Sequence, residues 1–129
     1  MDYQYWSDYL FQAQRKAIAV EPITDFEKEL SVDDGYKIQE LLMDHRYNEG
    51  EKIIGAKAGL TSIAKQKAMG VNEPVYGIIT DKMMLVSGEK VELDKFIHPR
   101  VEPEIVFILG KDLSGHNLKV EEILDATEF

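Results

Sequence analysis

Two glutamates separated by one residue, Glu102 and Glu104, lead into the apolar segment 105–109. If this segment is a β-strand, its two-residue period places both carboxylates on one face, where they can converge on a hard cation. Magnesium is typically held by one or two carboxylates, with water and substrate oxygens completing its shell. The alternative is an edge strand with a solvated acidic face, which Pro103 would suit because it donates no ladder hydrogen bond. The continuous apolar run favours a buried strand, since a solvated edge should alternate.

Lys57 lies between two alanines in the sequence Gly55-Ala-Lys-Ala-Gly59. Few neighbouring side chains can cover its ammonium group, so the carboxylate of a ligand could approach closely. Backbone amides opening a helix at Thr61 and Ser62 could add to anion binding. The alternative is a strand lysine whose ammonium group extends into solvent.

Three further side chains are ambiguous. Asp81 is either a turn-capping residue or a general base, and its spacing does not decide between them. Arg100 could bind a substrate carboxylate, or it could neutralise the two glutamates. His98 is the only histidine close to these glutamates in sequence.

The composition predicts one globular unit. The chain has 129 residues, of which 44% are hydrophobic and 30% charged, enough for a single compact core. A formal net charge of -9 argues against a nucleic-acid surface. The absence of cysteine excludes disulfides and thiolate zinc sites. With no long apolar run and no leader segment, we expect no membrane association and a cytoplasmic location.

Helical periodicity dominates up to Gly50 and then gives way to short strand-like runs. An apolar stripe predicts a helix over 2–20, ended by Pro22. Ser31 and Asp34 form a carboxylate version of the capping box at the start of a second helix, which Gly50 closes. Its expected buried side chains are Val32, Ile38, Leu41, Leu42 and Met43.

After Gly50 we expect short strands and two short helices. A strand over 52–60 is followed by a helix over 63–69, which Ser62 caps and Gly70 closes. Residues 74–77 are typical of a turn or an edge, and a hairpin is expected around Ser87-Gly88 between 84–86 and 91–93. The strand that follows Glu102 leads to a turn at 114–117 and a helix over 120–126.

Several motifs together resemble one family, the 2-hydroxypenta-2,4-dienoate hydratases and 4-oxalocrotonate decarboxylases. They are GAKAGLTS at 55–62, MGVNEPVYG at 69–77, Asp81, and VEPEI at 101–105. The family's catalytic unit is fumarylacetoacetase-like, so the resemblance implies an α+β fold. In that fold, 1–70 would form a small α/β cap region and 71–129 the first part of a mainly β catalytic unit. The chain is similar to the N-terminal half of the family's length.

The resemblance also implies roles for individual residues. Glu102 and Glu104 match two of the family's three magnesium carboxylates. The third would lie beyond Phe129, and Glu128 does not match it. The implied set comprises catalytic Lys57 and Asp81, substrate-binding Leu60, Thr61, Ser62 and Arg100, and metal-binding Glu102 and Glu104.

These similarities imply a metal-dependent lyase that uses Mg²⁺, with Mn²⁺ as the alternative. The expected reaction is decarboxylation of 4-oxalocrotonate (2-oxohex-3-enedioate) to 2-hydroxypenta-2,4-dienoate in aromatic meta-cleavage catabolism. The forms of the motifs at 64–65, 74–77 and 97–99 favour the decarboxylase branch. The alternatives are the hydratase, which gives 4-hydroxy-2-oxopentanoate, and a non-catalytic binding module. We expect a small keto-acid substrate, a homo-oligomer and association with a partner enzyme of the pathway; whether 129 residues suffice for activity stays open.

Overall fold

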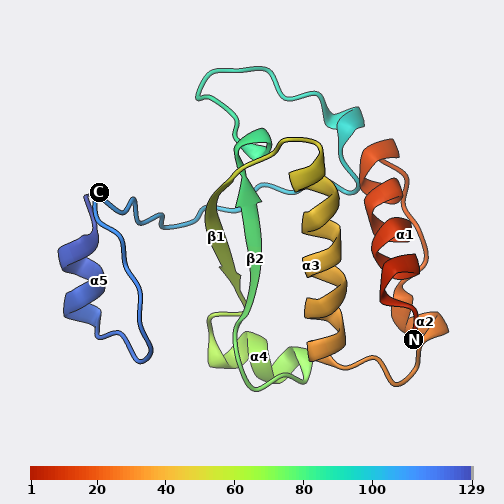
Figure 1. Cartoon of the computed structure of the whole chain (residues 1–129), viewed down its shortest axis with the longest axis horizontal. Helices are drawn as coiled ribbons and strands as arrows, with labels where there is room; N and C mark the ends of the chain where they lie inside the picture. Colours follow the sequence, from red (N-terminus) through yellow and green to blue (C-terminus); the bar gives the residue numbers. More distant parts are fainter. Residues whose placement is uncertain (129) are drawn as a thin grey trace. The chain divides into compact units, whose positions relative to one another are not determined.

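The computed structural model describes residues 1–128 as two compact units, which divide between Pro99 and Arg100. The first unit contains α1 (Tyr3–Lys16), α2 (Ile23–Phe26), α3 (Val32–Asn48), β1 (Ile53–Gly59), α4 (Ile63–Met69) and β2 (Val75–Thr80), as Figure 1 shows. Single 3₁₀ turns follow at Asp81–Met83 and Leu93–Lys95, and the second unit contains α5 (Val120–Ala126). None of the described helices has the length and apolarity needed to cross a membrane.

Helix α1 is shorter than its sequence pattern predicts. It begins where the Asp2 carboxylate accepts a hydrogen bond from the Tyr5 amide at 3.0 Å. It ends because Ala17 adopts a left-handed conformation, with φ 50°, which turns the chain out of the helix. The prediction that it continues to residue 20 and is ended by Pro22 was therefore wrong. Pro22 instead precedes the one-turn helix α2.

Helix α3 begins and ends as the sequence predicts. The Ser31 hydroxyl accepts from the Asp34 amide, and the Asp34 carboxylate accepts from the Ser31 amide, which completes the capping box. After Asn48 the chain turns through Gly50, whose φ is 87°. The Tyr3 hydroxyl also donates to the Asp34 carboxylate at 2.7 Å. One carboxylate therefore fixes the start of α3 and links it to α1.

The core of the first unit lies where α1 and α3 pack together beside β2. Phe11, Leu42 and Met43 form its buried cluster, and Leu10 and Ile78 pack against it. The predicted burial of Ile38 is confirmed, and Trp6 and Ala13 of α1 are buried as well. Val32 was predicted on the buried side but is 46% exposed, because it occupies the first turn of α3, ahead of the segment that packs on α1 and β2.

Strands β1 and β2 form a two-stranded antiparallel sheet, in which Lys57 pairs with Gly77. The predicted strand over 52–60 is confirmed. The predicted helix over 63–69 is also confirmed, with Ser62 as its N-cap and Gly70 as its left-handed C-cap at φ 70°. In the segment 74–77, predicted as a turn or an edge, residues 75–77 form the first half of β2, which has β1 as its neighbour in the two-stranded sheet.

Two expected strand regions do not form within the described residues. The turn at Ser87-Gly88 is present, with Gly88 at φ 89°, but 84–86 and 91–93 do not pair as a hairpin. Residues 101–108 form no strand, and Ile105 and Phe107 are 86% and 55% exposed. The prediction of a strand buried on both faces was wrong for these residues, since a strand needs hydrogen-bonding partners along its length.

In the second unit, the segment around Leu109 contacts the end of the described chain, and Lys111 forms an ion pair with Asp125 at 2.9 Å. Leu109 forms an isolated antiparallel bridge with Thr127, flanked by hydrogen bonds from Gly110 to Ala126 and from Glu128 to Ile108. The predicted bounds of α5 are confirmed. Gly115 and Asn117 have φ values of 139° and 58°, which fits the predicted turn at 114–117.

The predicted α+β class is confirmed at its coarse level by these helices and the two-stranded sheet. The mainly β part expected over 71–129 contains β2 as its one strand within the described residues, and Phe129 lies outside them. The division of the fold at residue 70 stays a prediction.

The Asp34 contacts predict a stability that falls with acidity. Hydrogen bonds from Ser31 and Tyr3 hold the pKa of Asp34 far below its usual value. A carboxyl group whose pKa is lowered on folding stabilises the folded state. Its full contribution is present above the pKa of Asp in the unfolded chain, about 3.9, and is lost as the pH falls below that value. We therefore expect Asp34→Asn to flatten the decrease in unfolding free energy between about pH 4 and pH 2.5, measured by urea denaturation.

Asp33→Asn provides the matched control, because Asp33 is exposed in the same helical turn. An identical pH dependence for both variants would contradict the role assigned to Asp34.

Candidate functional site

Lys57 has glycines at three of the five neighbouring positions on its face of the sheet. Residues two apart on a strand share a face, as do directly paired residues. Gly55 and Gly59 therefore flank Lys57 on its own strand, and Gly77 lies opposite it on β2. The adjacent Ala56 and Ala58 belong to the other face. Val75 and Ile79, which pair with Gly59 and Gly55, lie on this face as well. Gly77 could not be recognised as a neighbour of Lys57 from the sequence, because it is distant along the chain.

The space beside Gly55 is not needed for internal packing. A Cβ atom added at Gly55 would meet nothing within 4 Å. At Gly77 the nearest atom would be Gln39 Oε1 at 3.4 Å, an ordinary contact. At Gly59 it would meet Val75 Cγ2 at 3.3 Å, so the unfilled room lies beside Gly55 and not beside Gly59.

The loop between β1 and α4 is held in an uncommon conformation. Leu60 has a positive φ of 53°, which costs a non-glycine residue about 1–2 kcal/mol. Its carbonyl accepts a hydrogen bond from the buried Gln66 side chain at 2.8 Å. Ser62 accepts from the Lys65 amide at 3.2 Å and so begins α4. Backbone outliers of this kind are frequent at ligand sites, and this one lies in the segment predicted to bind substrate.

Asp81 joins the ends of the two strands. Its carboxylate accepts a hydrogen bond from the Lys52 amide at 2.9 Å, and its own amide donates to the Lys52 carbonyl at 3.0 Å. The Lys52 hydrogen bond lowers the pKa of Asp81, so the side chain is a carboxylate at neutral pH. The structure thus gives Asp81 a turn-stabilising role, while its catalytic role stays a prediction.

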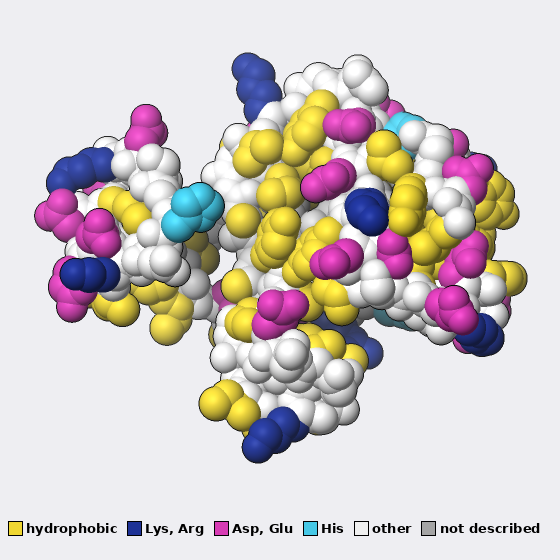
Figure 2. Space-filling view, turned by 60° about the horizontal axis from the view of Figure 1, so that its bottom comes forward, with side chains coloured by type: hydrophobic (Ala, Val, Ile, Leu, Met, Phe, Trp, Pro, Cys, Tyr) yellow, Lys and Arg dark blue, Asp and Glu magenta, His cyan; other side chains and the backbone are white. Residues whose placement is uncertain are grey.

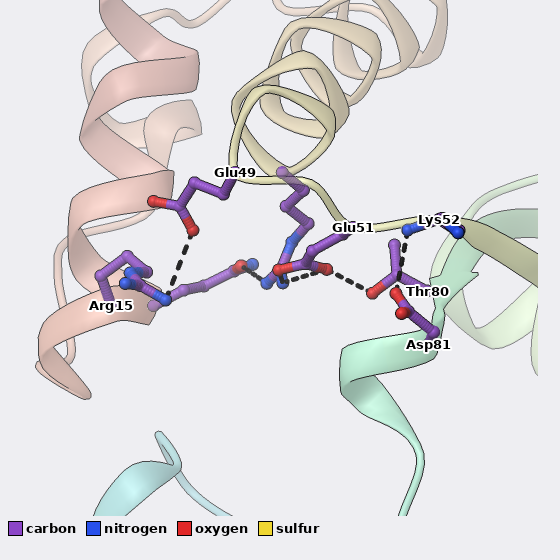
Figure 3. Close-up of polar contacts among 8 residues, drawn as sticks. Arg15, Glu49, Glu51, Lys52, Thr80 and Asp81 are labelled. Atoms are coloured by element: carbon purple, nitrogen blue, oxygen red, sulfur yellow. Dashed lines mark hydrogen bonds and ion pairs between the residues drawn. The ribbon is translucent and has the colours of Figure 1, made fainter.

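Next to Asp81, a chain of polar contacts links the sheet to both long helices (Figure 3). Thr80 is fully buried and donates to Glu51, whose side chain is 7% exposed. Glu51 also pairs with Arg46 at 3.1 Å, and Arg46 donates to Gln14 of α1 at 2.8 Å. The sequence analysis did not identify this network, because its members lie far apart in sequence and form no motif.

The remaining predicted residues lie in the second unit. Arg100, Glu102 and Glu104 are exposed in the segment before Leu109. No group of three or more His, Asp or Glu side chains that could hold a metal ion exists within the part of the chain described. Two carboxylates one residue apart still suit Mg²⁺ chemically, because Mg²⁺ commonly keeps waters and substrate oxygens as ligands.

A search of family models found none that matches the chain. In sequence, the chain is 38% identical over 123 residues to the "TodF product hydratase" of Pseudomonas putida F1, covering 95% of this chain and 46% of that protein. It is 42% identical to a 2-hydroxypent-2,4-dienoate hydratase of Pseudomonas putida, covering 94% and 55%. A 4-oxalocrotonate decarboxylase of a Pseudomonas species is 41% identical over 99 residues, covering 77% and 38%.

The fold has a close counterpart among solved structures. The 4-oxalocrotonate decarboxylase of Pseudomonas putida G7, complexed with magnesium and adipate, superimposes with a TM-score of 0.91 at 29% identity. The match covers 97% of this chain and 48% of that one. The chain therefore spans about half the length of the relatives it matches. In sequence and in fold, this chain is a homologue of the 2-hydroxypentadienoate hydratases and 4-oxalocrotonate decarboxylases.

Proposed function

We propose that the protein is a magnesium-dependent lyase acting on small 2-keto acids, with decarboxylation of 2-oxohex-3-enedioate as its reaction. The observation that supports this most is the extent of its similarity to the decarboxylase solved with magnesium and adipate, which covers 97% of this chain. Adipate is a six-carbon dicarboxylate, as is the proposed substrate. Because the chain spans about half of that protein, the activity is proposed for the whole protein.

Lys57 is the proposed proton donor of the site. Gly55, Gly59 and Gly77 are its neighbours on this face of the sheet, and the space beside Gly55 gives room for a keto-acid carboxylate. The carboxylate of Asp81 has a lowered pKa, which makes it a poor proton donor at neutral pH. We therefore assign proton donation to Lys57 and positioning of strand ends to Asp81. The Leu60–Ser62 loop would line the keto-acid end, fixed by Gln66.

Glu102 and Glu104 are the proposed magnesium ligands of this chain. The bound ion would supply Lewis acidity at the keto-acid end of the substrate. During decarboxylation, the bond from C5 to the distal carboxylate breaks and carbon dioxide leaves. The electron pair moves through the conjugated system to the C2 oxygen, which takes a proton to give the dienol product. Arg100 is proposed to bind the distal carboxylate before it leaves.

A hydratase is the second candidate, because several of the relatives with 35–42% identity are named as hydratases. It would ketonise the dienol and add water at C4, with Lys57 again moving the proton. A non-catalytic binding module is the third candidate, since residues 1–128 contain no three-carboxylate group. The proposal also includes manganese as an alternative ion, a homo-oligomer, a cytoplasmic location and a partner enzyme of the pathway.

Turnover separates these candidates. We expect proton NMR of 2-oxohex-3-enedioate with the protein and Mg²⁺ to show loss of the distal carboxyl, and a chelator to abolish it. Conversion of 2-hydroxypenta-2,4-dienoate to 4-hydroxy-2-oxopentanoate would identify the hydratase instead. If a folded sample converts neither substrate, the chain is not catalytic by itself.

The open space around Lys57 can be tested by filling it. We expect Gly55→Val to weaken Mg²⁺-dependent binding of 2-oxoadipate at least about tenfold, a loss of about 1.4 kcal/mol, measured by calorimetry. Folding should persist because an added Cβ meets nothing at this position and valine favours strands. Ala58→Val is the matched control on the other face of β1. Equal losses of affinity in both variants would show that the glycine-lined face is not part of the ligand site.

Arg100 is tested by comparing two ligands. Arg100→Met should weaken binding of 2-oxoadipate about 10- to 100-fold, since a hydrogen bond to a charged group contributes about 1.5–3 kcal/mol. Binding of 2-oxopentanoate, which has no distal carboxylate, should not change. A similar loss for both ligands would place Arg100 outside the distal subsite.

A further inference from the structure

A cleft of about 1270 Å³ opens within the first unit, between α1, α3 and the loop that follows β2. Figure 1 shows this loop passing from the end of β2 over to the α1 side. None of the cleft's lining residues is among the predicted catalytic, substrate-binding or metal-binding residues. The cleft is therefore a separate feature from the Lys57 face.

The floor of the cleft is apolar. Ile38, Leu42 and Met43 of α3 and Ile78 of β2 line it on one side. Leu85, Val91 and Phe96 line it from the loop and are 55%, 40% and 45% exposed. Large apolar side chains on both sides of an open space favour a ligand with an apolar body.

Basic side chains are concentrated around this floor. Six basic and two acidic residues line the cleft, although the whole chain has 15 basic and 24 acidic residues. On the face shown in Figure 2, acidic side chains are spread widely and basic ones are isolated. The cleft is thus a local cationic region on an acidic protein, and it attracts anions.

Half of these basic residues already have acidic partners. Arg46 pairs with Glu51, Arg15 with Glu49, and Lys95 with Glu92. The other three form no ion pair with any residue in the range 1–128; they are Lys16, Lys82 and Lys90. Lys82 is attracted to the neighbouring Asp81 carboxylate, so Lys16 and Lys90 supply the positive charge beside the apolar floor that no ion pair of the described residues neutralises.

We propose that this cleft is a second ligand site, which binds a carboxylate with an extended apolar chain, the chemistry of a medium-chain fatty acid. The apolar chain lies on Leu42, Met43 and Ile78, and the carboxylate is held by Lys16 and Lys90. An apolar ligand without charge would leave the lysines unused, and a small anion would leave Leu85, Val91 and Phe96 exposed to water.

The test uses decanoate and the methyl signals of isoleucine and methionine in the folded chain, with a chelator present and no keto acid. We expect decanoate to shift the methyl signals of Ile38, Met43 and Ile78. Acetate has the carboxylate without a long apolar chain, and 1-octanol has the apolar chain without a charge. Both should bind at least about tenfold more weakly than decanoate. Because no metal or keto acid is present, the outcome does not depend on the proposed lyase site.

The Lys16→Gln/Lys90→Gln double variant should weaken decanoate binding at least about tenfold. The control is Lys28→Gln/Lys65→Gln, which removes the same charge outside the cleft and should bind like the original chain. Equal binding by both variants, equal binding of 1-octanol, or shifts confined to other methyl groups would overturn the proposal. Sedimentation that shows a dimer dissociated by decanoate would also overturn it, because the occupant would then be a second copy.

Discussion

The first unit depends on the nearly buried carboxylate of Glu51. A carboxylate removed from water must be paired and hydrogen-bonded, and Glu51 meets this requirement with Arg46 and the buried Thr80. Because Arg46 of α3 also donates a hydrogen bond to Gln14 of α1, the contacts made by Glu51 and Arg46 link α1, α3 and β2. Removal of a single partner would leave a buried charge without compensation, which is why such a network specifies one arrangement of helices and sheet.

The network also determines where the candidate site lies. Asp81 follows Thr80 directly and holds the start of β1 through Lys52, so the register of the two strands is fixed at this end. That register places Gly77 opposite Lys57. The position of Gly77 opposite Lys57 is therefore a consequence of contacts made at the other end of the sheet, and the site is positioned by the scaffold rather than by its own residues.

The apolar surface of the chain is consistent with its similarity to proteins of about twice its length. Ile53 and Ile54 at the start of β1 are 58% and 50% exposed, and Ile105 is 86% exposed. In the relatives, the matched region makes up about half of the chain. Ile53 pairs with Thr80, but β1 has a neighbouring strand on one side only among the described residues, and 101–108 forms no strand there. Apolar residues at such places stay exposed, because burial in a sheet requires a neighbouring element.

The sequence alone determined the local elements whose signals are contained in a few adjacent residues. The Ser31 capping box, the Ser62 cap and the glycines that follow α3 and α4 act through neighbouring backbone groups, so their positions could be predicted. It also identified Lys57 and the two glutamates as candidates. The tertiary structure alone decided the early end of α1, the placement of Gly77 beside Lys57, the Glu51 network and the exposure of 101–108. These features depend on which distant segments meet, and residue types in one segment carry no information about the partner that will cover them.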